Sequence, residues 1–262
     1  MNSRTIVCSV IAACVGVSVL IPPQPTSAEP ILKPRKYEGP IPKRYFTISI
    51  GFLGGADNAE MWDLLDRQVL STVEGETQTE DFGASLAFDG SYTAKVHPQF
   101  AFRAKAGLSV LQSESTGKWK PADEGLLNFN RQFDVLLFTL DATALFYFQD
   151  ASVKAFQTYA GIGLGAYFPY AKYTEELTDV GTGEPLPTTE QEQWDVQPGA
   201  HAILGFLYHI NPTTAIGMEG RVQMAMSKFS LTFVDTVGNT ETGNFDVDYT
   251  GFVLGLTVSK FF

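Results

Sequence analysis

The chain has 262 residues, of which 44% are hydrophobic, and its mean hydropathy is +0.00. A bundle of membrane-spanning helices would be more apolar, so that class is excluded, whereas strands that expose only alternate residues to lipid remain compatible with these values. The formal net charge of −11 argues against a nucleic-acid partner. The acidic residues concentrate in 56–81, 169–195 and 230–248, a pattern typical of solvated loops.

Residues 1–28 predict a cleaved secretory signal peptide. Arg4 supplies the positive start, the apolar core runs from Ile6 to Ile21, and a small-residue cleavage site ends at Ala28. The alternative, an uncleaved membrane anchor, is disfavoured because this core is shorter than the roughly 20 residues that a spanning helix needs. Both cysteines of the chain lie in this segment, so the mature chain is expected to have no thiol for a disulfide, a metal site or a nucleophile.

Residues 29–44 are rich in proline and in basic side chains, a composition that favours an extended tail over packed structure. We expect this Pro-rich tail to lie in the periplasm ahead of the first strand. A plug in the barrel lumen, or a contact with an acidic partner, is the alternative. The remaining residues, 45–262, are expected to form a single domain.

From Tyr45 onward the hydrophobic pattern has a period of two, which predicts strands with two distinct faces. In the fourth segment, for example, Leu140 and Ala142 belong to the apolar face and Asp141 to the polar face. The segments with this pattern are 45–52, 82–93, 100–110, 136–148, 155–168, 194–210, 215–226 and 251–258.

The connections between these segments alternate in length. Short connections span 95–99, 149–154 and 211–213, and long connections span 56–81, 112–132, 169–193 and 230–248. Outer-membrane barrels combine an even strand number with short periplasmic turns and long external loops. The sequence therefore predicts an all-β fold, an eight-stranded antiparallel transmembrane β-barrel with an up-and-down meander and both termini in the periplasm.

The polar face of the strands distinguishes this barrel from a soluble sandwich. It carries Gly, Ser, Thr, Gln and isolated charges, whereas a face exposed to water would carry more Lys and Glu. Aromatic residues also gather near both ends of the strands, which predicts two interfacial girdles. The expected girdle near the termini contains Tyr45, Phe46, Tyr92, Phe100, Phe148, Phe156, Tyr208 and Phe262, and the other contains Phe52, Phe82, Phe133, Phe168, Trp194, Phe229 and Phe252.

The segments GIGLGAYF at 161–168, GAHAILGFLYHINPTTAIGMEGR at 199–221 and GLTVSKFF at 255–262 resemble the small outer-membrane barrel family typified by OmpA, OmpX and OmpW. The resemblance covers about 45–262. It implies a location in the outer membrane, contact with the lipid bilayer and lipopolysaccharide, and insertion by the outer-membrane assembly machinery.

In that family the last strand, which ends in an aromatic residue, is the assembly signal. The matching residues here are Leu254, Leu256, Val258 and Phe262. Lys260 departs from the pattern, because an aromatic or apolar residue is usual at that position. This departure predicts weaker recognition by the assembly machinery.

An eight-stranded barrel is only just wide enough inside for side chains to fill it, so we expect a largely filled lumen. Some charged residues occupy the alternate strand positions whose side chains point inward. They are Asp89, Arg103, Lys105, Asp141, Glu219 and Arg221. Buried charges are stable when they are paired, which predicts a structural charge network. A hairpin centred near residue 97 would place Asp89 and Lys105 opposite each other. An ion or solute path through the lumen is the alternative.

The sequence predicts no catalytic site, cofactor or metal site. His97, His201 and His209 are the candidate bases, but no trio of His, Ser and an acidic residue has a supportive spacing. The acidic loops could bind divalent cations between lipopolysaccharide phosphates, although they show no fixed ligand spacing. We therefore do not expect an enzyme, and a lipid-modifying membrane enzyme is the least favoured hypothesis.

The first long connection contains a predicted helix at 59–70. Trp62, Leu65 and Val69 fall on one helical face after a cap at Asp57 or Asn58. This helix is expected to lie over the barrel mouth, or to contact a surface partner.

The sequence thus favours an integral outer-membrane barrel with a structural or surface-interaction role. The alternative is a narrow channel, similar to OmpW, for small or hydrophobic solutes.

Overall fold

The computed structural model describes residues 43–70, 75–120, 125–149, 156–234 and 240–262. The predicted signal peptide and all but the end of the Pro-rich tail lie outside the described residues. Within the described ranges, no helix is long and apolar enough to cross a membrane.

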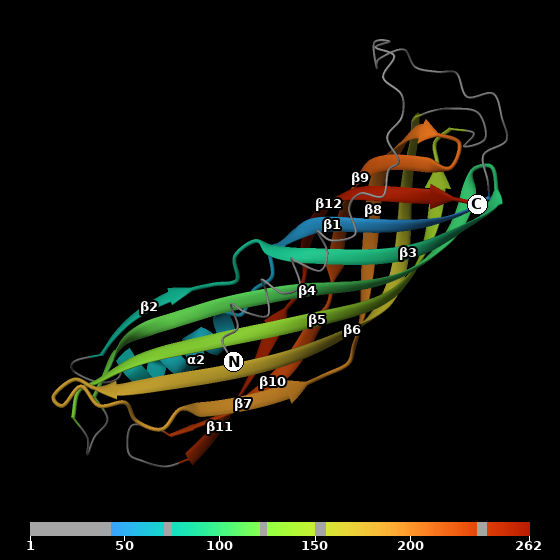
Figure 1. Cartoon of the computed structure of the whole chain (residues 1–262). Helices are drawn as coiled ribbons and strands as arrows, with labels where there is room; N and C mark the ends of the chain where they lie inside the picture. The colour runs from blue at the N-terminus through green and yellow to red at the C-terminus, as the bar shows by residue number, and fades with distance from the viewer. Residues whose placement is uncertain (1–42, 71–74, 121–124, 150–155, 235–239) are drawn as a thin grey trace, which may run out of the picture. The chain divides into compact units, whose positions relative to one another are not determined.

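Eight strands form a closed antiparallel barrel, which confirms the predicted fold class (Figure 1). Each strand pairs with the next barrel strand along the chain, and the last strand pairs with the first, from Tyr45 with Phe261 to Gly54 with Phe252. The barrel strands are β1 (Arg44–Gly54), β3 (Ser85–His97), β4 (Phe100–Trp119), β5 (Leu127–Tyr147), β6 (Phe156–Asp179), β8 (Gln197–Asn211), β9 (Thr214–Met224) and β12 (Gly251–Phe261).

The two faces of each strand have the predicted orientation. In β5, Leu136, Phe138 and Leu140 are 41–45% exposed on the outside of the barrel, whereas Leu137 and Thr139 are buried inside it. The other barrel strands continue this outer belt of exposed apolar side chains. A contiguous apolar belt of this kind would be unfavourable in water and matches the hydrocarbon layer of a membrane.

Three of the predicted long loops are largely strand in their described residues, so their boundaries at 112–132, 169–193 and 230–248 were wrong. The hairpin of β4 and β5 continues without a break from Phe100 paired with Phe146 to Trp119 paired with Leu127. Past the apolar belt, the outward side chains meet water and are polar, which made these strand ends look like loops. Their inward residues, such as Leu111 and Phe129, remain apolar and buried.

The extended ends of β4, β5 and β6 belong to a structure that we call the distal cup, because it lies at the end of the barrel away from Phe262 (Figure 1). Four short strands complete it: β2 (Glu76–Glu80), β7 (Thr189–Trp194), β10 (Met226–Val234) and β11 (Thr240–Asp248). Strand β2 pairs with β4, and β7 pairs with β6. Strands β10 and β11 form a separate two-stranded sheet.

The predicted helix is present as α2 (Ala59–Leu70). Its Trp62, Leu65 and Val69 are buried, as expected from their spacing. The backbone N–H of Ala59 donates to the carboxylate of Asp57 (2.8 Å), which caps the helix.

The helix is part of the cup wall. On one side, the hydroxyls of Thr77 and Thr79 in β2 donate to Asp66 (3.0 and 3.3 Å). On the other side, the backbone N–H of Asp246 in β11 donates to Glu60 (3.0 Å). The apolar face of α2 therefore packs into the cup interior between β2 and β11.

Four aromatic residues are not in the girdles that the sequence predicted. Tyr45, Phe82, Phe133 and Phe229 are 0–8% exposed and point into the barrel or the cup. Phe133 has the same parity as the buried Val135, and its ring lies 6.0–6.3 Å from the rings of Phe82, Phe229 and Phe245. Other predicted members, such as Phe52 and Trp194, are exposed on the outer face.

Candidate functional site: a charge network across the lumen

The strand register brings the six inward charged residues to one region of the lumen. Lys105 in β4 pairs directly with Asp141 in β5. Asp89 in β3 pairs with Gly107, so Asp89 and Lys105 are diagonal neighbours and not opposite each other as predicted. The reason is that the turn falls at residues 98–99, and a bulge between Lys95 and His97 shifts the register.

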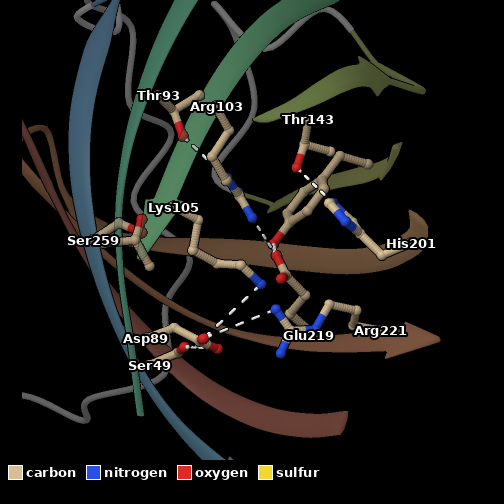
Figure 2. A network of polar contacts seen from close by, with 12 residues as sticks. Ser49, Asp89, Thr93, Arg103, Lys105, Thr143, His201, Glu219, Arg221 and Ser259 are labelled. Carbon is tan, nitrogen blue, oxygen red and sulfur yellow. Dashed lines mark hydrogen bonds and ion pairs between the residues drawn. The ribbon is translucent and has the colours of Figure 1, made fainter. Parts of the chain in front are cut away.

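One ion pair spans the full width of the barrel. Arg103 in β4 donates through Nη1 to the carboxylate of Glu219 in β9 (Figure 2). Three strands separate β4 from β9 in either direction around the barrel, so the two residues come from opposite walls. Thr93 accepts a hydrogen bond from Arg103 Nε (3.2 Å), and the Tyr159 hydroxyl donates to Glu219 (2.7 Å).

A second group of ion pairs lies beside the first. Lys105 Nζ is 3.3 Å from Asp141 Oδ2 and 3.9 Å from Asp89 Oδ1. Arg221 Nη1, which projects from β9, is 3.6 Å from Asp141 Oδ2 and 3.8 Å from Asp89 Oδ1. The Ser49 hydroxyl also donates to Asp89 (3.2 Å; Figure 2). Because Arg221 reaches carboxylates on β3 and β5, this group also crosses the lumen.

The network is balanced in charge and shielded from solvent. It contains three carboxylates and three cations, and the six side chains are 1–13% exposed. A buried charge without a partner is strongly unfavourable, so each group depends on the others. The glycines on the inner wall make room for these side chains: a Cβ atom on Gly107 would lie 2.2 Å from Asp89 Oδ1.

His201, Thr143 and Tyr159 belong to the same region, beyond the six charged residues that the sequence predicts for the network. His201 Nε2 is within hydrogen-bond distance of Thr143 Oγ1 (2.8 Å; Figure 2) and 3.8 Å from Asp141 Oδ1. A Cβ atom on Gly163 would lie 2.4 Å from His201 Nε2, so this glycine accommodates the imidazole. In the sequence, all three occupy strand positions whose side chains point inward. That position alone does not show which charged group each side chain contacts.

The three histidines lie in separate environments. His97 is at the turn after β3, where its Nδ1 accepts a hydrogen bond from the N–H of Gln99 (3.3 Å). His209 is buried against the ring of Phe261 at 4.7 Å between centroids. Among the described residues, no three or more His, Cys, Asp or Glu side chains form a group that could hold a metal ion.

A layer of aromatic side chains, which we call the basal layer, lies at the end of the barrel near Phe262. The hydroxyls of Tyr45 and Tyr147 are hydrogen bonded to each other, and the ring of Phe261 stacks on Tyr45 at 4.5 Å. Lys95 Nζ lies 4.7 Å from the centre of the Tyr147 ring, a cation–π distance. This layer fills the lumen below the charge network.

The four residues of the predicted assembly signal face outward. Leu254, Leu256, Val258 and Phe262 are 45–63% exposed, whereas Phe261 is buried in the basal layer. Of the two terminal phenylalanines, Phe262 is therefore the one accessible on the outer face.

Deletion of Phe262 should reduce insertion into the outer membrane, because this exposed terminal ring is the aromatic part of the predicted signal. Two measurements check this. The first is the share of the protein that stays in the outer membrane after extraction, and the second is the change in electrophoretic mobility of that protein on heating. The matched control is Phe252→Ala, which removes an exposed ring from the other end of the same strand and should leave insertion unchanged. Normal insertion of the truncated chain would contradict the prediction.

No protein-family model and no curated protein matches the sequence. Solved structures with a similar fold include OprG from Pseudomonas aeruginosa, with 14% sequence identity over 85% of this chain and 97% of that chain and a TM-score of 0.46. Neisserial surface protein A has 11% identity over 84% and 97% of the two chains and a TM-score of 0.42. A major outer membrane protein from Thermus thermophilus has 13% identity over 83% and 98%, with a TM-score of 0.43.

The closed antiparallel sheet and its apolar outer belt define the class of this protein. It is an eight-stranded β-barrel of the outer-membrane type.

Proposed function

We propose that the protein is an outer-membrane barrel with a closed lumen, and that it acts through structural or surface contacts made by the distal cup. The contact of Arg103 with Glu219 carries this proposal, because it joins opposite walls at the level of the charge network. A solute passing through the barrel would have to separate this buried ion pair. The desolvation of two charges makes such a separation unfavourable.

Two further layers support a closed lumen. The basal layer lies on one side of the network. On the other side, the cup interior is filled by an apolar cluster that includes Leu111, Phe133 and Phe245 from the strands and Trp62 from α2. A continuous path would therefore require changes at three separate levels of the barrel.

The distal cup supplies the surface for contacts outside the membrane. Its outward side chains are mostly polar or charged, for example Gln112, Asp134 and Glu192, and they follow directly after the apolar belt. With the termini in the periplasm, this polar surface stands above the outer leaflet, next to lipopolysaccharide and accessible to partners. Neither catalysis nor a cofactor is part of this proposal.

Conductance across planar lipid bilayers tests the closed lumen. Purified wild-type protein should give no stable single-channel current, because the buried charge network blocks the lumen. A preparation with the heat-dependent mobility of a folded barrel ensures that inactive aggregates are not being measured. Reproducible stepwise currents from such a preparation would contradict the proposal and would favour a narrow channel.

A further inference from the structure

Two basic side chains stand on the outer surface of the barrel where β1 and β12 close the sheet, at the end near Phe262. Arg44 and Lys260 are exposed, and alternation along their strands gives them the same outward direction as the apolar belt. Lys260 pairs directly with Phe46, and the N–H of Phe262 donates to Arg44 O (3.1 Å). The two cations are therefore diagonal neighbours on adjacent strands, a separation that long side chains can span. We call Arg44, Phe46, Lys260 and Phe262 the basal rim.

The two cations of the basal rim are not neutralised by the protein. Among the described residues, no carboxylate oxygen lies within 4.0 Å of the charged group of Arg44 or Lys260. Lys260 Nζ donates instead to the neutral hydroxyl of Thr213 (3.1 Å) in the turn between β8 and β9. The basal rim thus presents positive charge that is available to an anion from outside the chain.

Aromatic rings place these cations at a membrane interface. Phe46, Tyr92 and Phe262 are 40–63% exposed on the outer face, and the rings of Tyr92 and Phe262 lie 6.3 Å apart. Exposed aromatic side chains gather at the level of the lipid headgroups. Lys and Arg keep their aliphatic stems against apolar surface at this level and extend their charges toward water. The contact of Lys260 with the turn shows this direction, so its charge lies at the depth of lipid phosphates.

The opposite end of the barrel has a different charge at the edge of the belt. There the outward residues include Asp134, and the charge of Lys172 is offset by Glu190 (3.1 Å) and Glu192 (4.0 Å). A field of one sign attracts ions of the other sign, so the basal rim favours a phosphate group and the opposite edge does not.

We propose that the basal rim is a binding site for the headgroup of an anionic phospholipid, with Arg44 and Lys260 contacting its phosphate. A guanidinium donates two parallel hydrogen bonds to phosphate oxygens, and an ammonium adds a point charge beside them. The rings of Phe46 and Phe262 pack against the upper part of the acyl chains. The proposal gives a role to Lys260, the residue that departs from the aromatic pattern of the last strand.

The source of the lipid rests on the orientation that the proposed function uses. With the termini in the periplasm, the basal rim meets the inner leaflet of the outer membrane, so the ligand is a phospholipid of that leaflet. The site lies on the outer surface and does not use the lumen. Lipid binding and conductance are therefore separate measurements, and either proposal can fail while the other stands.

The first experiment compares lipids that stay bound to the mature protein in native mass spectrometry, after release from micelles with equal amounts of phosphatidylglycerol and phosphatidylcholine. Wild type should retain phosphatidylglycerol in preference. Arg44→Gln/Lys260→Gln should weaken this binding by about fivefold for each cation, and so by about 25-fold in the double variant. The matched control is Lys118→Gln/Lys228→Gln, which removes the same charge from the distal cup and should bind as wild type does.

The second experiment locates the lipid. Phe46→Trp places a fluorescent side chain in the basal rim, whereas the exposed Trp194 lies at the other end and Trp62 and Trp119 are buried in the cup. In phosphatidylcholine nanodiscs, brominated phosphatidylglycerol should quench the added fluorescence more than the same share of brominated phosphatidylcholine does. The fluorescence of wild type should show no such preference for phosphatidylglycerol.

The third experiment tests which leaflet the basal rim meets. Thr213→Cys introduces a thiol next to Lys260. A maleimide too large to cross the outer membrane should label it in lysed cells and not in intact cells. Labelling in intact cells would place the basal rim against lipopolysaccharide, which would overturn the assignment to an inner-leaflet phospholipid.

Three other results would overturn the lipid site itself. They are equal retention of the two phospholipids by wild type, wild-type retention by Arg44→Gln/Lys260→Gln, and an equal loss in Lys118→Gln/Lys228→Gln. Equal quenching of Phe46→Trp by the two brominated lipids would also overturn it, because the bound lipid would then lie elsewhere. The heat-dependent shift in mobility checks that every variant is folded.

Discussion

Arg103→Ala should lower the free energy of unfolding by about 3 kcal/mol, because it leaves the carboxylate of Glu219 buried without its ionic partner. The hydroxyl of Tyr159 still donates to Glu219, but a single neutral hydrogen bond does not replace a guanidinium. The effect can be measured by urea unfolding in lipid vesicles, followed by tryptophan fluorescence. The variant should also conduct more than wild type in planar bilayers, since the link across the lumen is lost.

The double variant Arg103→Ala/Glu219→Ala separates pairing from packing. It should be more stable than Arg103→Ala alone, because no unpaired charge remains in the lumen. Lys118→Ala, which removes an exposed lysine of the distal cup, is the control and should change neither stability nor conductance. Two results would show that water already solvates these charges and that the lumen is open. One is an Arg103→Ala variant as stable as wild type, and the other is a double variant whose loss of stability equals the sum of the losses of the two single variants.

Phe133→Ala should destabilise the protein by about 3–5 kcal/mol, because it removes a ring at the centre of the cup interior. Phe133 is 1% exposed and contacts the rings of Phe82, Phe229 and Phe245. These rings come from different parts of the chain and cannot all move inward to fill the space. Urea unfolding under the same conditions provides the measurement.

The matched control is Phe138→Ala on the same strand. Phe138 is 41% exposed on the lipid-facing side, where lipid chains can occupy the space left by the ring. Its loss should therefore be much smaller than that of Phe133→Ala. Equal losses in the two variants would contradict the inward placement of Phe133 and support its original assignment to an interfacial girdle.

Local patterns in the sequence were sufficient for much of this fold. Residues two apart share a face of a strand, so alternation alone separated the outward Leu140 from the inward Asp141. The spacing of Trp62, Leu65 and Val69 likewise identified the helix and its buried face. The same rule also identified all six inward charges. These features depend on neighbours along the chain, and the sequence displays such neighbours directly.

The tertiary structure decided which of these residues meet. Arg103 and Glu219 are 116 positions apart and come together only because the barrel closes, so no local pattern could pair them. Phe133 was misplaced because the predicted strand began at residue 136, and alternation points its ring inward only once β5 is known to extend through it. The contacts of Gln191 and Gln193 in β7 with the backbone of β10 likewise depend on where these two strands stop pairing with others. Closure of the sheet sets these long-range distances, whereas the sequence by itself determined only the strand faces and the side chains available on them.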